Sequence, residues 1–444
     1  MKQDFHAFLE EYGGRHPEDV LVVPDELSAD QDVSAVVWTL AAQGRYPLLV
    51  FERVNGIKVA TSIFASRARI ARLLDTVPEK IHQVYQEKSR KAVDPMIVDR
   101  GPILDSVESR VDLTKLPLLK HFETDRAPYI TNGIIVAASN LSYHRAMLHS
   151  KTELATSLHS RGHLWRLLEI SKEKKQPLAV AMVIGAHPLF MMAASARVAF
   201  GADERRIAGG LLGEPLQLIK TPKHGIGVPA AAEIVLEGTL DPEARVEEGP
   251  FGEFTGYSSN RTTNTLFRVE TVLRRRDAIL VDVVGGNSPE HLNLSRVPRE
   301  SEMAEKLAER FPSVTRLHYP NSGVHFHAYV ALRARREGEA RQVMLALLGW
   351  DPYLKTVIAV DDDVDVTDDS QVMWALAAHL QPQRDVLIVD GLPGSALDPS
   401  ASGAGTTSRM GLDATRGPHF EGVRARISDA ALARAAGILE RAGR

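Results

Sequence analysis

The stretch "YITNGIIVAASNLSYHRAM", residues 129–147, joins a strand-like apolar run to a group of polar side chains. Similar apolar runs follow in "PLAVAMVIG" (177–185), "TLFRVETVLRRR" (265–276) and "AILVDVVGG" (278–286). Loops rich in Gly, Pro, Asn and His separate them, and few long helical patterns lie between. This arrangement favours an antiparallel β domain over a doubly wound sheet.

The segments on either side mix helix and strand. Before the β-rich region, "SIFASRARIARLLDTV" (62–77) has one apolar helical face, and "YPLLVFERV" (46–54) reads as a buried strand. After about residue 300, helical patterns such as "EARQVMLALLGW" alternate with strand patterns such as "TVIAVDDDVDV". Prolines and polar residues near residue 113 indicate a boundary. We therefore predict three domains, at residues 1–112, 113–300 and 301–444.

Composition excludes several classes of protein. With 444 residues, 44% of them hydrophobic and 25% charged, the chain has the composition of a globular protein with sizeable cores. Fifty-three basic residues against fifty-seven acidic ones leave a net charge of −4, so a nucleic-acid partner is not expected. The first residues, "MKQDFHAFLEEYGG", predict neither a signal peptide nor a membrane span, and we expect a cytoplasmic protein. Because the chain has no cysteine, any metal must be held by His, Asn, Asp or Glu.

The segment "EEGPFGEFTGYSS", residues 247–259, places Glu248 and Glu253 five positions apart around a Gly-Pro-Phe-Gly turn. Glycine and proline prevent a regular helix or central strand there, so a stiff, curved loop is expected. A solvated surface turn is the alternative. The rings of Phe251, Phe254 and Tyr257 argue against it, because an exposed turn has little use for large rings.

Further polar side chains come from three separate segments of the middle region. An amide oxygen, an imidazole and a carboxylate from such segments suit a hard cation, Mg²⁺ or Mn²⁺, which needs no sulfur ligand. Taken singly, a His or Glu is more often a satisfied structural residue. The segments "SNLSYHRAM", "HSRGHLW" and "FGADERR" supply Asn140, Ser142, His144, Arg145, His159, Arg161, His163 and Glu204.

The motif "EGPFGEFTGY" resembles the signature of the UbiD-type decarboxylases, which use prenylated flavin mononucleotide. The family's Asn-x-x-x-x-Arg pattern matches Asn140 and Arg145, its metal histidine falls on His163 in "RGHL", and its metal glutamate matches Glu204. His159 is the alternative to His163. "VPAAAEIVLEGTL", "VPRESEM", "DDDVDVTDDSQVMWALA" and "SRMGLDAT" also look like the family, so the resemblance extends from about residue 100 to 420.

The resemblance implies a multidomain α+β fold. A central split β-barrel, of the flavin reductase-like kind, would bind the cofactor between N-terminal and C-terminal α/β domains. The C-terminal domain would serve self-association, giving a homodimer or a hexamer. A flavin prenyltransferase would supply the cofactor.

The same resemblance implies roles for individual residues. Arg145 would hold the substrate carboxylate, Glu248 would pair with Arg145, and Glu253 would protonate the carbon that loses carbon dioxide. We expect the paired acid to stay ionised and burial to push the pKa of the other upward. Asn140, His163 and Glu204 would hold Mn²⁺ or Mg²⁺, with K⁺ or Na⁺ nearby. The residues implied around the cofactor are Asn140, Ser142, His144, Arg145, Arg161, His163, Ala194, Ser195, Glu204 and Arg409.

The expected activity is reversible, non-oxidative decarboxylation of an aromatic or heteroaromatic carboxylic acid through a covalent adduct with prenylated FMN. The "NLSYHR" variant favours a pyrrole-, furan- or indole-type acid, with Asn321 or His327 as a donor to the ring heteroatom. Phenolic, polycyclic and acrylic acids are alternatives, and a non-catalytic flavin-binding scaffold is the rival from another class. "VHFHAYV" puts His325 and His327 on one predicted strand face, where a structural role is favoured over metal binding.

Overall fold

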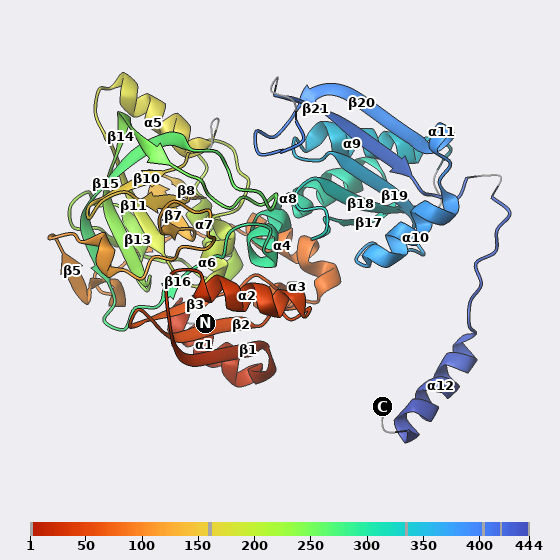
Figure 1. Ribbon diagram of the computed structural model, residues 1–444, viewed down its shortest axis with the longest axis horizontal. Helices are drawn as coiled ribbons and strands as arrows, with labels where there is room; N and C mark the ends of the chain where they lie inside the picture. The colour runs from red at the N-terminus through yellow and green to blue at the C-terminus, as the bar shows by residue number, and fades with distance from the viewer. Residues whose placement is uncertain (1–2, 159–161, 334–335, 402–404, 418–419, 443–444) are drawn as a thin grey trace.

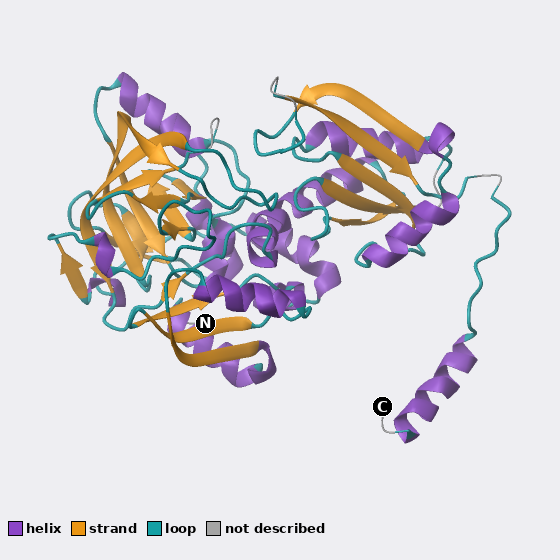
Figure 2. Cartoon of the chain, viewed as in Figure 1, coloured by secondary structure: helices purple, strands orange, loops and turns teal. Residues whose placement is uncertain are grey.

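The computed structural model of the protein describes residues 3–158, 162–333, 336–401, 405–417 and 420–442. Figure 1 shows an N-terminal region in red and orange, a central region in yellow and green, and a C-terminal region in blue. Strands gather in the central region, and helices fill the space between it and the C-terminal region (Figure 2).

The N-terminal region builds a small mixed sheet. Strands β1 and β2 are parallel, β2 and β3 are antiparallel, and β16 returns from the central region to pair in parallel with β3. Its core is continuous with that of the central region, because Phe5, Ile134 and Val183 belong to one buried cluster. The elements are α1 (Phe5–Arg15), β1 (Val20–Leu27), α2 (Asp32–Ala42), β2 (Leu48–Val54), β3 (Ile57–Thr61), α3 (Arg67–Leu73), α4 (Ile81–Arg90) and β16 (Leu280–Val281).

The central region is one large, mainly antiparallel sheet, as the strand pattern predicts. Its order is β6-β9-β10-β15-β14-β11-β7-β8, and β5 pairs with β15. Apolar side chains alternate to both faces, and Leu154, Leu236 and Phe267 are fully buried. The strands are β5 (Ser106–Glu108), β6 (Tyr129–Ile130), β7 (Gly133–Ala137), β8 (Asn140–Tyr143), β9 (Ala146–Leu148), β10 (Glu153–Thr156), β11 (Leu178–Ile184), β14 (Ile234–Glu248) and β15 (Thr262–Arg274).

The expected barrel is not closed. Within the described residues, the two ends of the sheet, β6 and β8, pair with β9 and β7 but not with each other. Both end strands are short, and a bend at residues 131–132 separates β6 from β7. The multidomain α+β class is therefore confirmed, whereas a closed barrel is not what this sheet forms.

Three helices and a small sheet complete the central region. Helix α5 (His163–Glu173) begins at the predicted site residue His163, and α7 (Glu204–Leu212) begins at Glu204. Helix α6 (Pro188–Ala193) comes directly before Ala194 and Ser195. The small sheet pairs β4 (Met96–Ile97), β12 (Gln217–Lys220) and β13 (Gly227–Pro229).

The C-terminal region is a second α/β unit with the sheet order β17-β18-β19-β21-β20. Helix α8 connects it to the central region and spans the domain boundary predicted at residue 300. The boundaries of the three predicted domains stay predictions. Strand β18 begins at His327 and His325 lies in the preceding turn, so the two histidines do not share a strand face. The elements are α8 (Pro289–Arg310), β17 (Val314–His318), β18 (His327–Leu332), α9 (Glu339–Trp350), β19 (Thr356–Asp361), α10 (Asp369–His379), α11 (Pro382–Asp385), β20 (Val386–Pro393), β21 (Thr406–Asp413) and α12 (Asp429–Arg441).

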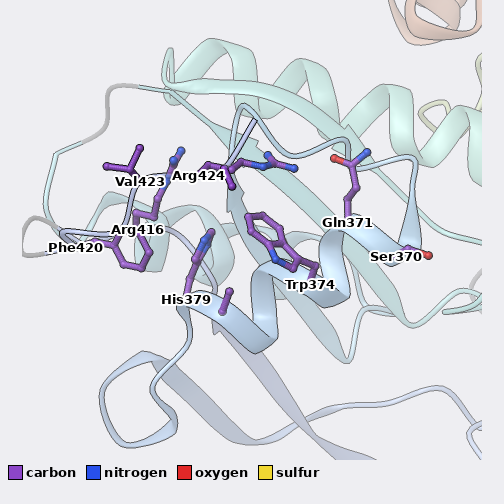
Figure 3. Close-up of a pocket in the computed structure, with 11 residues that line it drawn as sticks. Ser370, Gln371, Trp374, His379, Arg416, Phe420, Val423 and Arg424 are labelled. Carbon is purple, nitrogen blue, oxygen red and sulfur yellow. The ribbon is translucent and has the colours of Figure 1, made fainter. Parts of the chain in front are cut away.

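The chain ends in an extended segment and α12, which stands clear of the rest of the molecule in Figure 1. The start of this segment lies along α10 and encloses a groove of about 500 Å³ with Trp374, His379, Phe420 and Arg424 in its wall (Figure 3). None of the residues that line this groove is among the predicted site residues. Among the described helices, none combines the length and the apolar character that a membrane crossing requires.

Candidate active site

The acid loop, residues 248–257, begins where β14 ends. Glu248 is the last residue of that strand and pairs with Thr262 of β15, so its backbone is fixed by the sheet. Gly249 then takes a positive φ of 85°, which turns the chain away from the strand. The backbone of Gly252 bridges to Ser258 across the loop. The sequence pattern thus yields the predicted curved loop.

Arg145 joins the two acids of this loop. Its Nε donates to Glu248 Oε1 over 3.0 Å and its Nη2 to Glu248 Oε2 over 3.3 Å, while its Nη1 donates to Glu253 Oε1. The guanidinium also lies 4.6 Å from the centre of the Phe251 ring. Burial alone would lower the pKa of Arg145, but the facing carboxylates of Glu253 and Glu248 outweigh it and raise that pKa. The arginine therefore stays charged.

Glu248 is fully buried, yet four donors surround its carboxylate. Besides the two bonds from Arg145, it accepts from Tyr129 Oη at 3.0 Å and from Asn264 Nδ2 at 2.9 Å. A buried carboxylate is tolerated when its oxygens are satisfied in this way. Glu248 therefore has its oxygens satisfied and holds Arg145 in place.

Glu253 is in a different environment. It is 5% exposed, and within the described residues Arg145 is its only ion-pair partner. Burial raises the pKa of Glu253, and Arg145 offsets this only in part. A carboxyl group with a raised pKa, next to a fixed cation, is suited to giving and taking a proton.

A second polar cluster forms where three elements begin. Asn140 opens β8, His163 opens α5 and Glu204 opens α7. Glu204 Oε2 accepts from the Leu141 backbone N–H at 3.0 Å, and Glu204 Oε1 lies 3.7 Å from His163 Nδ1. Burial raises the pKa of Glu204 to about 7. The three predicted ligands thus meet at one place.

The donor set of this cluster fits a hard divalent cation. Asn140 Oδ1 is buried and has no hydrogen-bond partner, while Asn140 Nδ2 donates to Ser142 Oγ at 2.8 Å. An orphaned amide oxygen beside a buried carboxylate and an imidazole is what a Mg²⁺- or Mn²⁺-type ion requires. In the part of the chain that the structure describes, no group of three or more His, Asp or Glu side chains forms a metal site, so this site depends on the asparagine.

Comparisons with known proteins point to one family. Three family models match consecutive segments: the 3-octaprenyl-4-hydroxybenzoate carboxy-lyase N-terminal domain at residues 15–88, its Rift-related domain at 96–288 and its C-terminal domain at 293–414. The anhydromevalonate phosphate decarboxylase of Methanosarcina mazei is 35% identical over 382 residues, which are 85% of this chain and 89% of that enzyme. The namesake from Aeropyrum pernix is 31% identical over 92% of each chain.

The chain belongs to the UbiD family. Accordingly it is a decarboxylase.

Solved structures of UbiD-class enzymes have the same fold. HmfF from Pelotomaculum thermopropionicum, in complex with FMN, superposes with a TM-score of 0.89 at 31% identity and covers 97% of each chain. The vanillic acid decarboxylase of Sedimentibacter hydroxybenzoicus, in an open form, superposes with a TM-score of 0.85 at 27% identity over 99% of each chain.

Other residues that the UbiD resemblance implies have these contacts. Ser142 Oγ is 2.9 Å from His144 Nε2, and His144 Nδ1 is 3.0 Å from the Ser157 carbonyl oxygen. Ala194 caps the end of α6, and the Ser195 hydroxyl donates to the Met192 carbonyl at 2.8 Å. Their part in binding a UbiD cofactor stays a prediction. His159 and Arg161 lie outside the described residues.

Arg409 is not part of this site. Its guanidinium donates to the carbonyl oxygens of Leu348, Asp351, Pro352 and Pro393, all in the C-terminal region. These bonds occupy the terminal nitrogens, so the geometry gives no support to a contact between Arg409 and the cofactor. Asn321 accepts from Arg296 through its amide oxygen, and its role as a donor to the substrate stays a prediction.

Sequence reasoning missed several residues that shape the site. Tyr129 and Asn264 hold Glu248, and Asp125 accepts the N–H of Gly252 at 3.1 Å. His291, near the start of α8, uses Nδ1 to bond the Gly286 carbonyl at 2.7 Å, and its pKa is lowered by burial and then by Arg145. None of them lies in a chemically distinctive motif. Only Tyr129 lies in a recognisable pattern, an apolar run, and that pattern predicts a strand and not a role in the site.

Proposed function

We propose that this protein catalyses reversible, non-oxidative decarboxylation of an unsaturated carboxylic acid with prenylated FMN, and that Glu253 is the proton donor. The observation that carries the proposal is the convergence of Glu248 and Glu253 on Arg145. A protein that only bound flavin would not need one cation shared by a fixed acid and a titratable one.

The cofactor follows from the solved relatives. HmfF is described in complex with FMN and, in an evolved dimeric form, with prenylated FMN. When bound, prenylated FMN would supply the electron sink that no side chain provides. Asn140, His163 and Glu204 would hold Mn²⁺ or Mg²⁺ with it, and K⁺ or Na⁺ would lie nearby. We propose a homodimer or a hexamer as the assembled form.

Arg145, Glu248 and Glu253 would each have a separate role in the reaction. The substrate carboxylate would bind the Arg145 guanidinium and replace Glu253 there, while Glu248 keeps Arg145 in position. Once the substrate has displaced it from Arg145, Glu253 is buried without a neighbouring cation. The pKa of Glu253 therefore rises further, and Glu253 holds a proton. When the bond to the carboxylate carbon breaks and carbon dioxide leaves, Glu253 gives that proton to the carbon left behind. Solvent then reprotonates Glu253.

For the substrate, anhydromevalonate phosphate is our first candidate. Four curated relatives from different organisms carry that name, at 30–35% identity over 85–92% of this chain. This acid is not aromatic. A decarboxylase of this type also fits the acrylic alternative that the sequence leaves open.

An aromatic or heteroaromatic acid is the second candidate. The close superposition with vanillic acid decarboxylase and the "NLSYHR" variant favour it. The preference for a pyrrole-, furan- or indole-type acid stays a prediction.

The experiment is a substrate panel. Protein co-produced with a flavin prenyltransferase would be incubated with anhydromevalonate phosphate, furoate, pyrrole-2-carboxylate and vanillate, and products would be followed by mass spectrometry in H₂O and D₂O. We expect carbon dioxide release from one class and one deuterium in the product. The Glu253→Gln variant should keep the cofactor spectrum and lose turnover by about 10²–10⁴-fold.

The matched control is Glu247→Gln, since Glu247 precedes Glu248 but is half exposed and pairs with Arg126 and Arg261. It should retain full turnover. If the loaded protein neither decarboxylates nor exchanges deuterium with any acid of the panel, the scaffold alternative is correct. An active Glu253→Gln variant would refute the role given to Glu253.

A further inference from the structure

A turn at residues 121–125 packs directly against the acid loop. Asp125 is 3% exposed, and its Oδ2 accepts the backbone N–H groups of His121 at 3.2 Å and Phe122 at 3.1 Å. Its Oδ1 accepts the N–H of Gly252 at 3.1 Å. The same carboxylate therefore closes its own turn and holds the residue before Glu253.

The backbone on both sides of Gly252 is tethered. The Gly252 carbonyl accepts the Gly286 N–H at 3.0 Å, and the Glu253 N–H donates to the Tyr257 carbonyl at 2.9 Å. With the Gly252 N–H on Asp125, the three bonds fix the direction in which the Glu253 side chain leaves the chain. Two of these bonds are backbone to backbone, and only the one from Asp125 depends on a side chain.

The ring of Phe122 completes the contact. A Cβ atom on Gly252 would lie 2.4 Å from this ring, and one on Gly286 would lie 2.7 Å from it. The ring therefore packs against the backbone at both positions. Only glycine permits this, because any other residue would place a Cβ atom inside the ring's contact distance. Phe122 packs against the acid loop at Gly252, and Asp125 accepts a hydrogen bond from the Gly252 N–H of the same loop.

We propose that Asp125 is a positioning residue for Glu253 and that it acts through the Gly252 N–H. This inference rests on the proposed function, because the orientation of Glu253 matters only if Glu253 transfers a proton. Asp125 itself touches neither substrate nor cofactor in this scheme. It keeps the proton donor in position to reach the carbon that loses carbon dioxide.

The Asp125→Asn variant separates this role from a structural one. The amide oxygen can still accept from the His121 and Phe122 N–H groups. The NH₂ group then faces the Gly252 N–H, and because both groups are donors, no hydrogen bond can form between them. The turn is kept and the tether to the acid loop is lost. Misplacement of a reacting group by about 1 Å can cost roughly 10²-fold in rate.

The experiment combines kinetics with amide hydrogen exchange on the cofactor-loaded protein. For Asp125→Asn we expect kcat to fall by at least about tenfold with KM within about twofold, and exchange to speed up in a peptide covering residues 249–258. Phe122→Leu, which removes part of the ring beneath the loop, should change both readouts in the same direction. Asp368→Asn is the control, because Asp368 accepts the Ser370 N–H at 2.9 Å at the start of α10, in the C-terminal region. It should leave both readouts unchanged.

Two results would overturn the proposal. One is faster exchange of the acid loop with unchanged kcat, which means that the tether does not position Glu253. The other is unchanged exchange, which means that there is no tether. If the unaltered protein itself shows no turnover, the proposed function fails, while the exchange measurement still reports on the tether.

Discussion

At the scale of single residues, two glutamates five positions apart differ because their surroundings differ. Glu248 has four donors, and Glu253 has one cation and little solvent. The charge of one is compensated from several sides, whereas the charge of the other is opposed by burial. The same chemical group therefore serves once as an anchor and once as an acid.

This difference predicts how the rate depends on pH. Because burial raises the pKa of Glu253, its protonated form persists above the ordinary carboxyl range. The protonated form is the donor, so kcat for decarboxylation should be high on the acid side and fall as pH increases through that raised pKa. Initial rates across pH 5–9 test this. A kcat that increases with pH would contradict the assignment, and Glu247→Gln should show the unaltered profile.

Tyr129 allows a second test of the anchor. Its hydroxyl donates to Glu248 and accepts from the Gly249 N–H at 3.2 Å, so Tyr129→Phe removes a donor from the buried carboxylate. We expect kcat to fall about tenfold and the free energy of unfolding to fall by about 2 kcal/mol. Tyr319→Phe removes a comparable hydroxyl bond, to Asp351 at 2.9 Å, which involves neither of the two acids. It should cost similar stability and leave kcat unchanged; equal kcat values for the two variants would argue against the anchor.

At the scale of elements, the metal cluster is a meeting of three element ends. Asn140, His163 and Glu204 are each the first residue of a strand or helix, so their side chains are held by backbone that is already ordered. Sites carried on regular elements keep their geometry better than sites on loops. That these three residues bind a metal stays a prediction, and the order of the motifs in the sequence did not show the contacts between them.

A cation titration tests this cluster without any need for activity. If the three residues bind Mn²⁺, the ion should raise the unfolding temperature, with a stabilisation of about 2.7 kcal/mol at one hundred times the dissociation constant. Glu204→Gln should abolish most of that response. Glu169→Gln, on the same region's helix α5 but partly exposed, should leave it intact. A full response in Glu204→Gln would place the ion elsewhere.

Elements with a strong local pattern were predictable, and those set by distant partners were not. The alternation in "TLFRVETVLRRR" indicated β15, and the helical face of "EARQVMLALLGW" indicated α9. "AILVDVVGG" yields only the two residues of β16, because its pairing depends on β3 of another region. The prediction that His325 shares a strand face with His327 was wrong for a related reason. Its Nε2 lies 2.9 Å from Ser295 Oγ of α8, a contact that strand spacing does not reveal.

The candidate site follows the same rule. Arg145, Glu248 and Glu253 stood in distinctive motifs, so these residues could be singled out before their contacts were known. Asp125 and Tyr129 act through hydrogen bonds to a loop more than one hundred positions away, and Arg409 is occupied by carbonyls of its own region. Contacts of this kind are set by the fold and leave no local pattern in the sequence.

At the scale of the whole molecule, the acid loop also touches the C-terminal region. The Phe254 ring, next to Glu253, lies 4.6 Å from the His325 ring and 5.5 Å from the Phe326 ring. Helix α8 links the same two regions and carries buried charges along its length. The placement of the C-terminal region is therefore coupled to the loop that bears the proton donor.

Glu300 of α8 is the charged centre of this junction. It is fully buried, and it meets Arg67 at 2.9 Å, His82 at 3.1 Å and His318 at 3.3 Å. These partners come from α3, α4 and β17, so one carboxylate joins the N-terminal and C-terminal regions. Although burial opposes its charge, Arg67 and His82 hold the pKa of Glu300 well below the ordinary value.

Because the folded pKa of Glu300 is lowered, its contribution to stability is complete above the pKa of the unfolded chain and is lost as pH falls towards the folded value. Glu300→Gln should thus lower the free energy of unfolding by roughly 3–5 kcal/mol at pH 7. The difference from the unaltered protein should shrink as pH falls below the ordinary glutamate pKa of 4.5. Denaturant unfolding at several pH values measures it. Glu302→Gln, on the same helix but partly exposed and paired with Lys306, is the control and should change stability little. A constant difference between pH 7 and pH 4 would show that the charge of Glu300 does not hold the regions together.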